Sequence, residues 1–259
     1  MKLLELINAT KIYTAFEGLF AGSGTSFKAA DDISITLEQG KNLGIVGESG
    51  SGKTTVAKII CDIIQPDSGE ALYKGRNIKA LGKGYAEYRK NVQMIFQDPY
   101  TSLNPKLTVF SAMYDGIAAH SSLTKTEIRE KCETLMEMVG LEKEHLDRFP
   151  HEFSGGQRQR VSIARALSLD PEIIIADEPV SSLDVSVQAQ ILNLLKKLSK
   201  ENNITLVLIS HDLAVVSFLC DEVIVMHKGK IVERGTAEQV IHSPREEYTK
   251  KLLEACVYR

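Results

Sequence analysis

The chain has 259 residues, of which 43% are hydrophobic and 25% charged, and its formal net charge of −3 corresponds to a pI near 6.1. This length can bury a substantial core as one large domain, but the acidic balance provides no basic surface for nucleic acid. No apolar run approaches the ~20 residues that span a bilayer, and the first residues lack the apolar stretch of a signal peptide. We therefore expect no nucleic-acid partner, and membrane association only through another protein.

The four cysteines are far apart in the sequence and form no C-x-x-C pair; they are Cys61, Cys132, Cys220 and Cys256. Spacing of this kind does not suggest a disulfide framework or a metal site. We expect reduced, partly buried thiols in a protein of the reducing cytosol.

The first third of the chain predicts strands followed by a helix. Residues 3–13 and 27–37 alternate apolar and polar residues and are typical of strands, with a glycine-rich loop at 18–24 between them. The short apolar run 43–46 predicts a further strand. A helix is expected from Lys53 to about Ile64, where a Pro-Asp-Ser-Gly turn signal ends it. A short strand and a turn at residues 73–76 come next.

The segment between the strand at 43–46 and the helix matches the pattern G-x-x-x-x-G-K-[ST], in the strand-loop-helix context of a phosphate-binding loop. Glycines let backbone N–H groups turn inward around an anion, and the helix N-terminus adds partial positive charge. Lys53 would reach the β- and γ-phosphates, and the Thr54 hydroxyl would ligate Mg²⁺. The alternative, a glycine-rich turn that binds nothing, does not explain why every fixed position is filled. The predicted contacts to a nucleoside triphosphate are Gly47, Glu48, Ser49, Gly50, Ser51, Gly52, Lys53, Thr54 and Thr55.

The middle of the chain changes from a strand to helices. Residues 91–96 predict an apolar strand, and the two prolines of 97–105 predict a loop with a defined bend. Thr124-x-x-Glu127 is a capping box, and helical spacing follows it, so residues 107–150 are interpreted as a small inserted helical subdomain.

The last third returns to an α/β pattern. The apolar runs 171–176 and 204–209 are typical of buried parallel strands, and the helix between them has an apolar stripe. Residues 222–226 and 231–232 would close the sheet around a turn at 228–230. Thr236-x-x-Gln239 caps a last helix, and a short charged tail follows Pro244.

Polar side chains follow two of these strands. Asp177 suits a Mg²⁺ contact, the adjacent Glu178 can accept a proton from an attacking water, and Gln97 can ligate Mg²⁺ or hold that water. An isolated Asp-Glu pair or glutamine would more simply face solvent. Downstream of a phosphate loop, the functional interpretation is favoured.

A second anion-binding pattern narrows the class. A helix is expected to begin at Ser154-Gly155-Gly156-Gln157, whose backbone N–H groups could bind a second anion. Because one chain needs only one γ-phosphate site, this second site suggests contact with a nucleotide that another chain holds. Here the sequence resembles the ABC ATPase family over nearly its whole length. The motifs occur in the family's order: the phosphate loop at 47–54, Gln97, the signature at 153–157, Asp177-Glu178, Ser182-Leu183-Asp184 and His211.

The resemblance implies one ABC-type nucleotide-binding domain over residues 1–259, with an α/β fold. A RecA-like phosphate-loop core and an N-terminal antiparallel β-subdomain would occupy about 1–100 and 158–235. The inserted α-helical subdomain would span about 101–157, and the short tail 236–259.

The resemblance also implies a mechanism that uses ATP and Mg²⁺. Two such domains would sandwich two ATP molecules head to tail, with the signature of one chain facing the γ-phosphate held by Lys53 of the other. Glu178 would be the general base, and Lys53, Gln97 and His211 would complete the catalytic set. The implied magnesium ligands are Thr54, Gln97 and Asp177. Further nucleotide contacts would come from Tyr13 on the adenine, from Ser154, Gly155, Gly156 and Gln157, and from Asp184 across the dimer interface.

Within the family, residues 97–105, 150–153 and 176–188 are similar to the oligopeptide/dipeptide/nickel importer branch. Gly18-Leu19-Phe20 and the tail 244–249 are similar to it as well, and the Gly-Leu-Phe favours the second of its two ATPase subunits. This resemblance implies a second ATPase subunit, as a heterodimer or alternatively a homodimer. It also implies two membrane permeases, an extracellular solute-binding protein reached indirectly, and a peripheral place on the cytoplasmic face of the membrane.

Peptides are the expected solute, with nickel or a metal chelate as the alternative. Because only Cys256 lies near the end of the chain, we expect no iron–sulfur cluster of the kind some longer relatives carry.

Four other classes of protein share some of these features. A DNA-repair ATPase would separate its motifs by long coiled coils, whereas Thr54 and Ser154 are 100 residues apart, and a translation-associated ATPase would carry two cassettes. A soluble ATPase of iron–sulfur assembly is the strongest rival, but it would not be expected to carry the loop at 98–105. A non-enzymatic binding module is disfavoured because Lys53, Glu178 and His211 are all present.

Overall fold

The computed structural model describes residues 1–15, 25–98 and 103–257, and the chain divides into two compact units. Unit 1 comprises Met1–Gly82 and Val207–Arg259, and unit 2 comprises Lys83–Leu206. The loop predicted at 18–24 and most of the bend predicted at 97–105 lie outside the described residues. None of the helices described in these ranges is long and apolar enough to cross a membrane.

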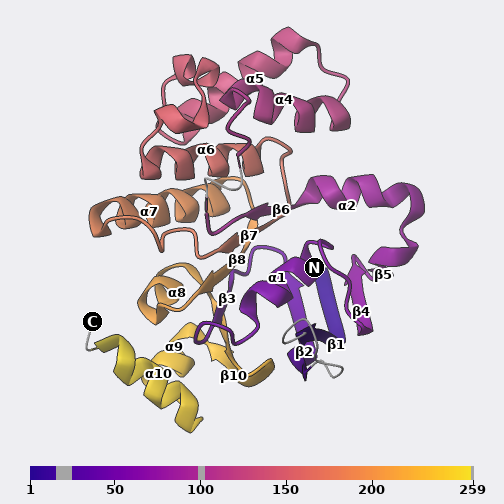
Figure 1. Ribbon diagram of the computed structural model, residues 1–259, viewed down its shortest axis with the longest axis vertical. Coiled ribbons are helices and arrows are strands. Elements are labelled where there is room, and N and C mark those ends of the chain that lie inside the picture. The colour runs from indigo at the N-terminus through magenta and orange to yellow at the C-terminus, as the bar shows by residue number, and fades with distance from the viewer. Residues whose placement is uncertain (16–24, 99–102, 258–259) are drawn as a thin grey trace, which may run out of the picture. The chain divides into compact units, whose positions relative to one another are not determined.

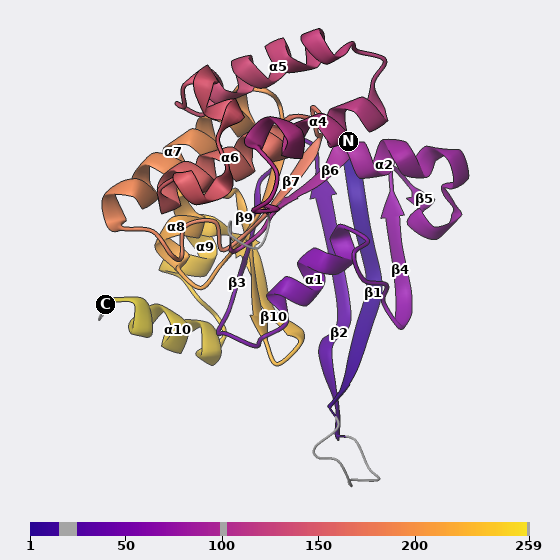
Figure 2. The same cartoon turned by 45° about the horizontal axis from the view of Figure 1, so that its top comes forward.

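Unit 1 contains an antiparallel sheet of four strands in the order β2-β1-β4-β5. The long strands β1 (Lys2–Ala15) and β2 (Thr25–Glu38) form a hairpin, and β4 (Ser68–Tyr73) lies beside β1 (Figure 2). The short β5 (Arg76–Asn77) pairs with β4. Leu6, Ile33 and Ile35 are buried, because the apolar alternation seen in the sequence presents these side chains to the core. Both predicted strands are therefore confirmed.

Unit 1 also contains a second set of strands, around β3 (Leu43–Val46). It pairs in parallel with β8 (Thr205–Ser210) on one side and β9 (Glu222–His227) on the other. The strand β10 (Lys230–Thr236) runs antiparallel to β9. The strand predicted from the apolar run 43–46 is confirmed, and all four residues of β3 are buried, as is typical of a strand covered on both faces.

The helix after the phosphate loop is shorter than predicted. The sequence predicted a helix to about Ile64, but α1 ends at Ile60, so its bounds are Lys53–Ile60. Asp62 adopts a left-handed conformation with φ of 51°, and the Ile63 amide donates to the Lys58 carbonyl oxygen at 2.9 Å. This is a Schellman-type ending formed without glycine, and for that reason no stop signal can be recognised in the sequence at that point.

Three further α-helices described in unit 1 lie near the C-terminus: α8 (Leu213–Leu219), α9 (Ala237–His242) and α10 (Glu247–Val257), the last in yellow in Figure 1. A 3₁₀ turn, Ile78–Ala80, follows β5. The predicted capping box of Thr236 and Gln239 is confirmed at the start of α9. The predicted charged tail instead contains α10, an amphipathic helix that the sequence analysis did not identify.

Unit 2 joins a pair of parallel strands to a group of helices. The strands are β6 (Val92–Ile95) and β7 (Ile173–Asp177), and α4 (Val109–His120), α5 (Lys125–Met138) and α6 (Gly155–Leu167) pack together (Figure 1). Among the described residues unit 2 also contains α2 (Tyr85–Asn91), α7 (Val185–Glu201) and the 3₁₀ turns Lys143–Asp147 and Pro150–Glu152. A further 3₁₀ turn at Gly82–Gly84 joins the units in sequence.

The α/β class and the Thr124 capping box are confirmed in these elements, whereas α2 was not predicted. The predicted limits of the helical subdomain, about 101–157, remain a prediction. Cys61, Cys132 and Cys220 are buried and take part in no disulfide, as expected, and burial raises the pKa of the Cys132 thiol to about 11.

Candidate active site

The phosphate loop connects β3 to α1 inside unit 1. Lys53 begins α1 and is buried, and its Nζ donates to the carbonyl oxygens of Gly47 and Glu48 at 2.8 Å each. The ammonium group is therefore folded back against the first two residues of its own loop. A positive charge held at the loop entrance is suited to an incoming anion.

The N-terminus of α1 is built without side chains that would compete with an anion. Its N-cap residue, Gly52, has φ of 105° and provides no side-chain acceptor, and the first turn contains no acidic residue. A Cβ at this position would collide with the carbonyl oxygen of Ala29, so only glycine fits. The buried Ser51 Oγ has no hydrogen-bond partner among the described residues. The loop thus offers the helix dipole and an unpaired hydroxyl, which fits a phosphate group.

Two further predicted residues belong to unit 1. The ring of Tyr13 on β1 lies 5.9 Å from that of Phe27, its exposed partner on β2, with an interplanar angle of 30°. His211 directly follows β8, and the β3–β8 register pairs Val46 with Ser210. Gly47 and His211 therefore leave the sheet at the same edge, because parallel strands end together there.

In unit 2, the register of two parallel strands brings Gln97 and Glu178 together. Ile95 pairs with Ala176, so Gln97 and Glu178 each lie two residues beyond the paired ends. The Gln97 Nε2 donates to Glu178 Oε2 at 3.2 Å. Asp177, the last residue of β7, is buried. The side chains of Gln97 and Glu178, both predicted to be catalytic, are thus hydrogen-bonded to each other. The buried Asp177, predicted to bind metal, directly precedes Glu178 in the chain.

Glu178 has an unusual backbone. Its φ of 45° is in the left-handed region, which a residue with a side chain adopts at a cost in energy. The Ser181 amide and hydroxyl both donate to the Glu178 carbonyl oxygen, at 3.3 and 3.2 Å, and so hold this turn. The strained conformation turns the chain sharply after β7 at the residue predicted to act as the base.

The Ser-Gly-Gly-Gln segment begins α6, as predicted. Ser154 caps the helix by accepting from the Gln157 amide at 3.3 Å, while Gln157 Oε1 accepts from the Ser154 amide at 3.0 Å. A Cβ on Gly156 would lie 2.6 Å from Val187 Cγ1 of α7, so glycine allows a close approach of the two helices. Asp184 stands at the N-cap of α7, where its carboxylate makes no capping hydrogen bond.

The sequence analysis missed two residues beside the predicted site. Phe27 could have been found from the alternation of β2, which places it opposite Tyr13. Tyr248 of α10 accepts a hydrogen bond from the Glu48 amide of the phosphate loop at 3.2 Å. The signal for α10 was the spacing of Tyr248 and Leu252, four residues apart on one helix face, in a segment interpreted as a tail.

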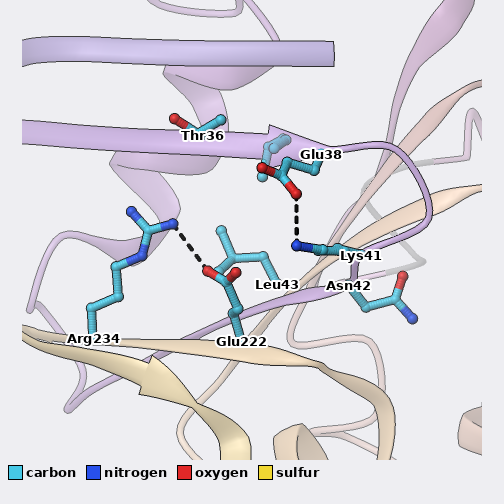
Figure 3. Close-up of a pocket in the computed structure, with 8 residues that line it drawn as sticks. Thr36, Glu38, Lys41, Asn42, Leu43, Glu222 and Arg234 are labelled. Carbon is cyan, nitrogen blue, oxygen red and sulfur yellow. Dashed lines mark hydrogen bonds and ion pairs between the residues drawn. The ribbon is translucent and has the colours of Figure 1, made fainter. Parts of the chain in front are cut away.

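A separate small pocket lies in unit 1, with a volume of about 30 Å³, between the end of β2 and the start of β9 (Figure 3). Its charged side chains form ion pairs with one another, Lys41 with Glu38 at 2.7 Å and Arg234 with Glu222 at 3.0 Å. With its charges paired and room for about one water molecule, this pocket is not suited to a nucleotide.

Comparison with known proteins agrees with this geometry. The family described as "ABC transporter" matches residues 30–181, which is more than half of the chain. The dipeptide transport ATP-binding protein DppF of Haemophilus influenzae is 48% identical over 98% of this chain and 77% of that protein. The oligopeptide transport ATP-binding protein OppF of Bacillus subtilis is 46% identical over 98% of this chain and 82% of that protein. A solved dimeric ATP-binding cassette in a post-hydrolysis state, bound to ADP and Pi, has a TM-score of 0.79 at 29% identity, covering 91% of this chain and 99% of that one.

Proposed function

The chain belongs to the ABC transporter family, and on this premise we propose that it is the ATP-hydrolysing subunit of an importer for oligopeptides or dipeptides. The observation that carries the proposal is the geometry of the phosphate loop. Buried Lys53 is hydrogen-bonded to the first two residues of the loop, and the loop ends at the N-terminus of α1, which has no side-chain cap. The family and the fold class predicted from the motifs are both confirmed by this membership. Relatives named for dipeptide and oligopeptide transport favour peptides over nickel or a metal chelate.

The proposed reaction is hydrolysis of ATP to ADP and phosphate. The loop amides and Lys53 bind the phosphates, and Tyr13 stacks on the adenine. Glu178 accepts the proton of the water that attacks the γ-phosphorus, and the bond to the β-phosphate oxygen breaks as ADP leaves. The Gln97 amide holds one oxygen of that carboxylate, which supports its role in orienting the base.

Thr54, Gln97 and Asp177 are the residues that we propose as magnesium ligands, because hydroxyl, amide and carboxylate oxygens are the donors that Mg²⁺ prefers. The ion supplies neutralisation of charge on the β- and γ-phosphate oxygens. His211 is proposed as a further contact to the γ-phosphate, and its position at the same sheet edge as Gly47 supports this.

The proposed assembly is a dimer of ATPase subunits, in keeping with the solved dimeric cassette to which this chain is similar. Ser154, Gly155, Gly156 and Gln157 would serve the nucleotide of the partner subunit, and Asp184 would lie at the interface. We propose a second, different ATPase subunit as the partner and a homodimer as the alternative. Two membrane permeases would receive the pair at the cytoplasmic face of the membrane, and a solute-binding protein outside would deliver the peptide.

The proposal is tested by measuring the affinity of the purified chain for Mg²⁺-ATP. Wild type should bind, and Lys53→Ala should bind at least about tenfold more weakly, because hydrogen bonds to a charged group are lost. Lys58→Ala removes a lysine from the same helix at its other end and should bind like wild type. A wild-type chain that binds no ATP, or a Lys53→Ala variant with unchanged affinity, would contradict the proposal.

A further inference from the structure

The C-terminal helix α10 contacts the phosphate loop directly. The Glu48 amide donates to the Tyr248 hydroxyl oxygen at 3.2 Å, although the two residues are 200 positions apart in the sequence. Glu48 is the second residue of the loop, and both residues belong to unit 1. The loop's geometry therefore depends on where α10 holds Tyr248.

A buried carboxylate fixes the start of α10. Glu233 of β10 accepts from the amides of Arg245 and Glu246, at 2.8 and 3.2 Å, immediately before the helix begins. Burial would raise the pKa of Glu233, but the nearby Thr249 side chain, these two amides and the charge of Arg245 together hold the pKa below its ordinary value. The carboxylate is therefore charged near neutral pH and anchors the helix to the sheet. Thr249 and Leu252 are buried as well, so the first turns of α10 have a fixed position.

The ring of Tyr248 is held from its other side. It packs on His227, the last residue of β9, with ring centroids 4.0 Å apart. The turn that follows His227 is itself bonded to the phosphate loop, because the Gly229 amide donates to the Ser51 carbonyl oxygen at 3.0 Å. Burial raises the pKa of the Tyr248 hydroxyl, which therefore stays neutral and accepts the Glu48 hydrogen bond.

Glu48 connects this contact to the catalytic lysine. Its N–H is held by Tyr248, while its carbonyl oxygen accepts from Lys53 Nζ at 2.8 Å and from the Ser51 amide at 3.2 Å. A shift of Glu48 would therefore move an acceptor of the ammonium group that binds phosphate. We propose that Tyr248 is a positioning residue for ATP binding, which acts through Glu48 on Lys53 and the phosphate loop. This inference rests on the proposed function.

The first test uses Tyr248→Phe, which keeps the ring on His227 and removes only the hydroxyl oxygen. ATP affinity should fall about two- to tenfold, the range expected for one hydrogen bond, with kcat at saturating ATP close to wild type. Tyr114→Phe makes the same chemical change on α4 of unit 2 and serves as the matched control. The melting temperature of each variant shows whether a loss of affinity is merely a loss of folding.

A second measurement does not depend on ATP at all. In the nucleotide-free full-length chain, amide hydrogen exchange of the peptide covering residues 46–53 should be faster in Tyr248→Phe than in wild type and Tyr114→Phe. Unchanged exchange and unchanged ATP affinity would overturn the inference, as would an affinity loss that merely follows a lowered melting temperature. If wild type binds no ATP, the proposed function fails, whereas the exchange comparison still decides whether Tyr248 positions the loop.

Discussion

At the scale of single residues, Glu178 shows how strand register and a local turn position a carboxylate. The β6–β7 register places it beside Gln97, whose amide holds one carboxylate oxygen at 3.2 Å. Its left-handed backbone is held by two hydrogen bonds from Ser181. A left-handed backbone conformation costs energy, and it is retained here at the residue proposed as the base. This is consistent with selection for the position of the Glu178 side chain over local stability.

The base assignment predicts the behaviour of Glu178→Gln. The amide cannot accept the proton of the attacking water, so hydrolysis should fall roughly 10²–10⁴-fold while ATP affinity stays near wild type. Phosphate release and nucleotide binding measure the two effects separately. Glu130→Gln, the same change at an exposed position on α5, should leave both near wild type. Near-normal turnover in Glu178→Gln would remove Glu178 from the role of base.

The sequence predicted residue types better than residue geometry. Glycine, lysine and threonine at fixed spacing identify the phosphate loop, because each supplies a chemical property that the motif requires. The left-handed φ of Glu178 and the contact of Glu48 with Tyr248 depend on distant parts of the chain, and nothing in the local pattern encodes them. These features required the structure.

At the scale of elements, the start of α6 packs tightly on α7. A methyl group at Gly156 would lie 2.6 Å from Val187 Cγ1, whereas one at Gly155 would meet Leu183 Cδ2 at an ordinary 3.5 Å. Gly156→Ala should therefore lower the free energy of unfolding by about 1–3 kcal/mol, and Gly155→Ala should be neutral or slightly stabilising. Denaturant titration compares the two variants, and adding Val187→Ala to Gly156→Ala should restore much of the loss. Equal stabilities of the two single variants would contradict this account of the contact.

The anchor of α10 predicts a dependence on pH. The Glu233 pKa is lowered in the folded chain relative to its ordinary value of 4.5, so its stabilisation is present above that pH. The stabilisation is lost as the pH falls through the folded-state pKa. Glu233→Gln should be less stable than wild type by about 1–3 kcal/mol at pH 7, and this difference should shrink below about pH 4.5. Unfolding titrations from about pH 2 to 7 cover the window below the ordinary pKa in which the loss should occur. Glu238→Gln, at an exposed position on α9, is the control, and a difference independent of pH over this range would reject the anchor.

The elements that the sequence predicted well are those with strong local periodicity. Every residue of β3 and β7 is buried, which the apolar runs 43–46 and 173–176 indicate, and α5 begins with a capping box. The helix α1 ended four residues early because Asp62 adopts the left-handed conformation without glycine, and α2 and α10 are short and rich in charge. In such segments the tertiary contacts, such as those of Glu233, decide the structure.

At the scale of the whole molecule, the proposed chemistry draws on both compact units. Tyr13, Lys53 and His211 belong to unit 1, whereas Gln97, Glu178 and the Ser-Gly-Gly-Gln signature belong to unit 2. Neither unit alone contains every residue of the proposed mechanism. The order of motifs along the chain was enough to identify the family, because that order is a property of the sequence. The solute leaves no comparable mark, since this chain is proposed to contact neither the peptide nor its path.

The central claim is that ATP hydrolysis by this chain energises an importer, and one measurement tests it most directly. Tagged Glu178→Gln would be trapped with ATP in its native cells, and the proteins that co-purify from detergent-solubilised membranes would be identified. Lys53→Ala, which should bind ATP poorly, is the matched control. Two permeases, a second ATPase subunit and a solute-binding protein should be present in the Glu178→Gln sample and depleted in the control. Recovery of only a soluble homodimer, or of iron–sulfur assembly proteins, would contradict it.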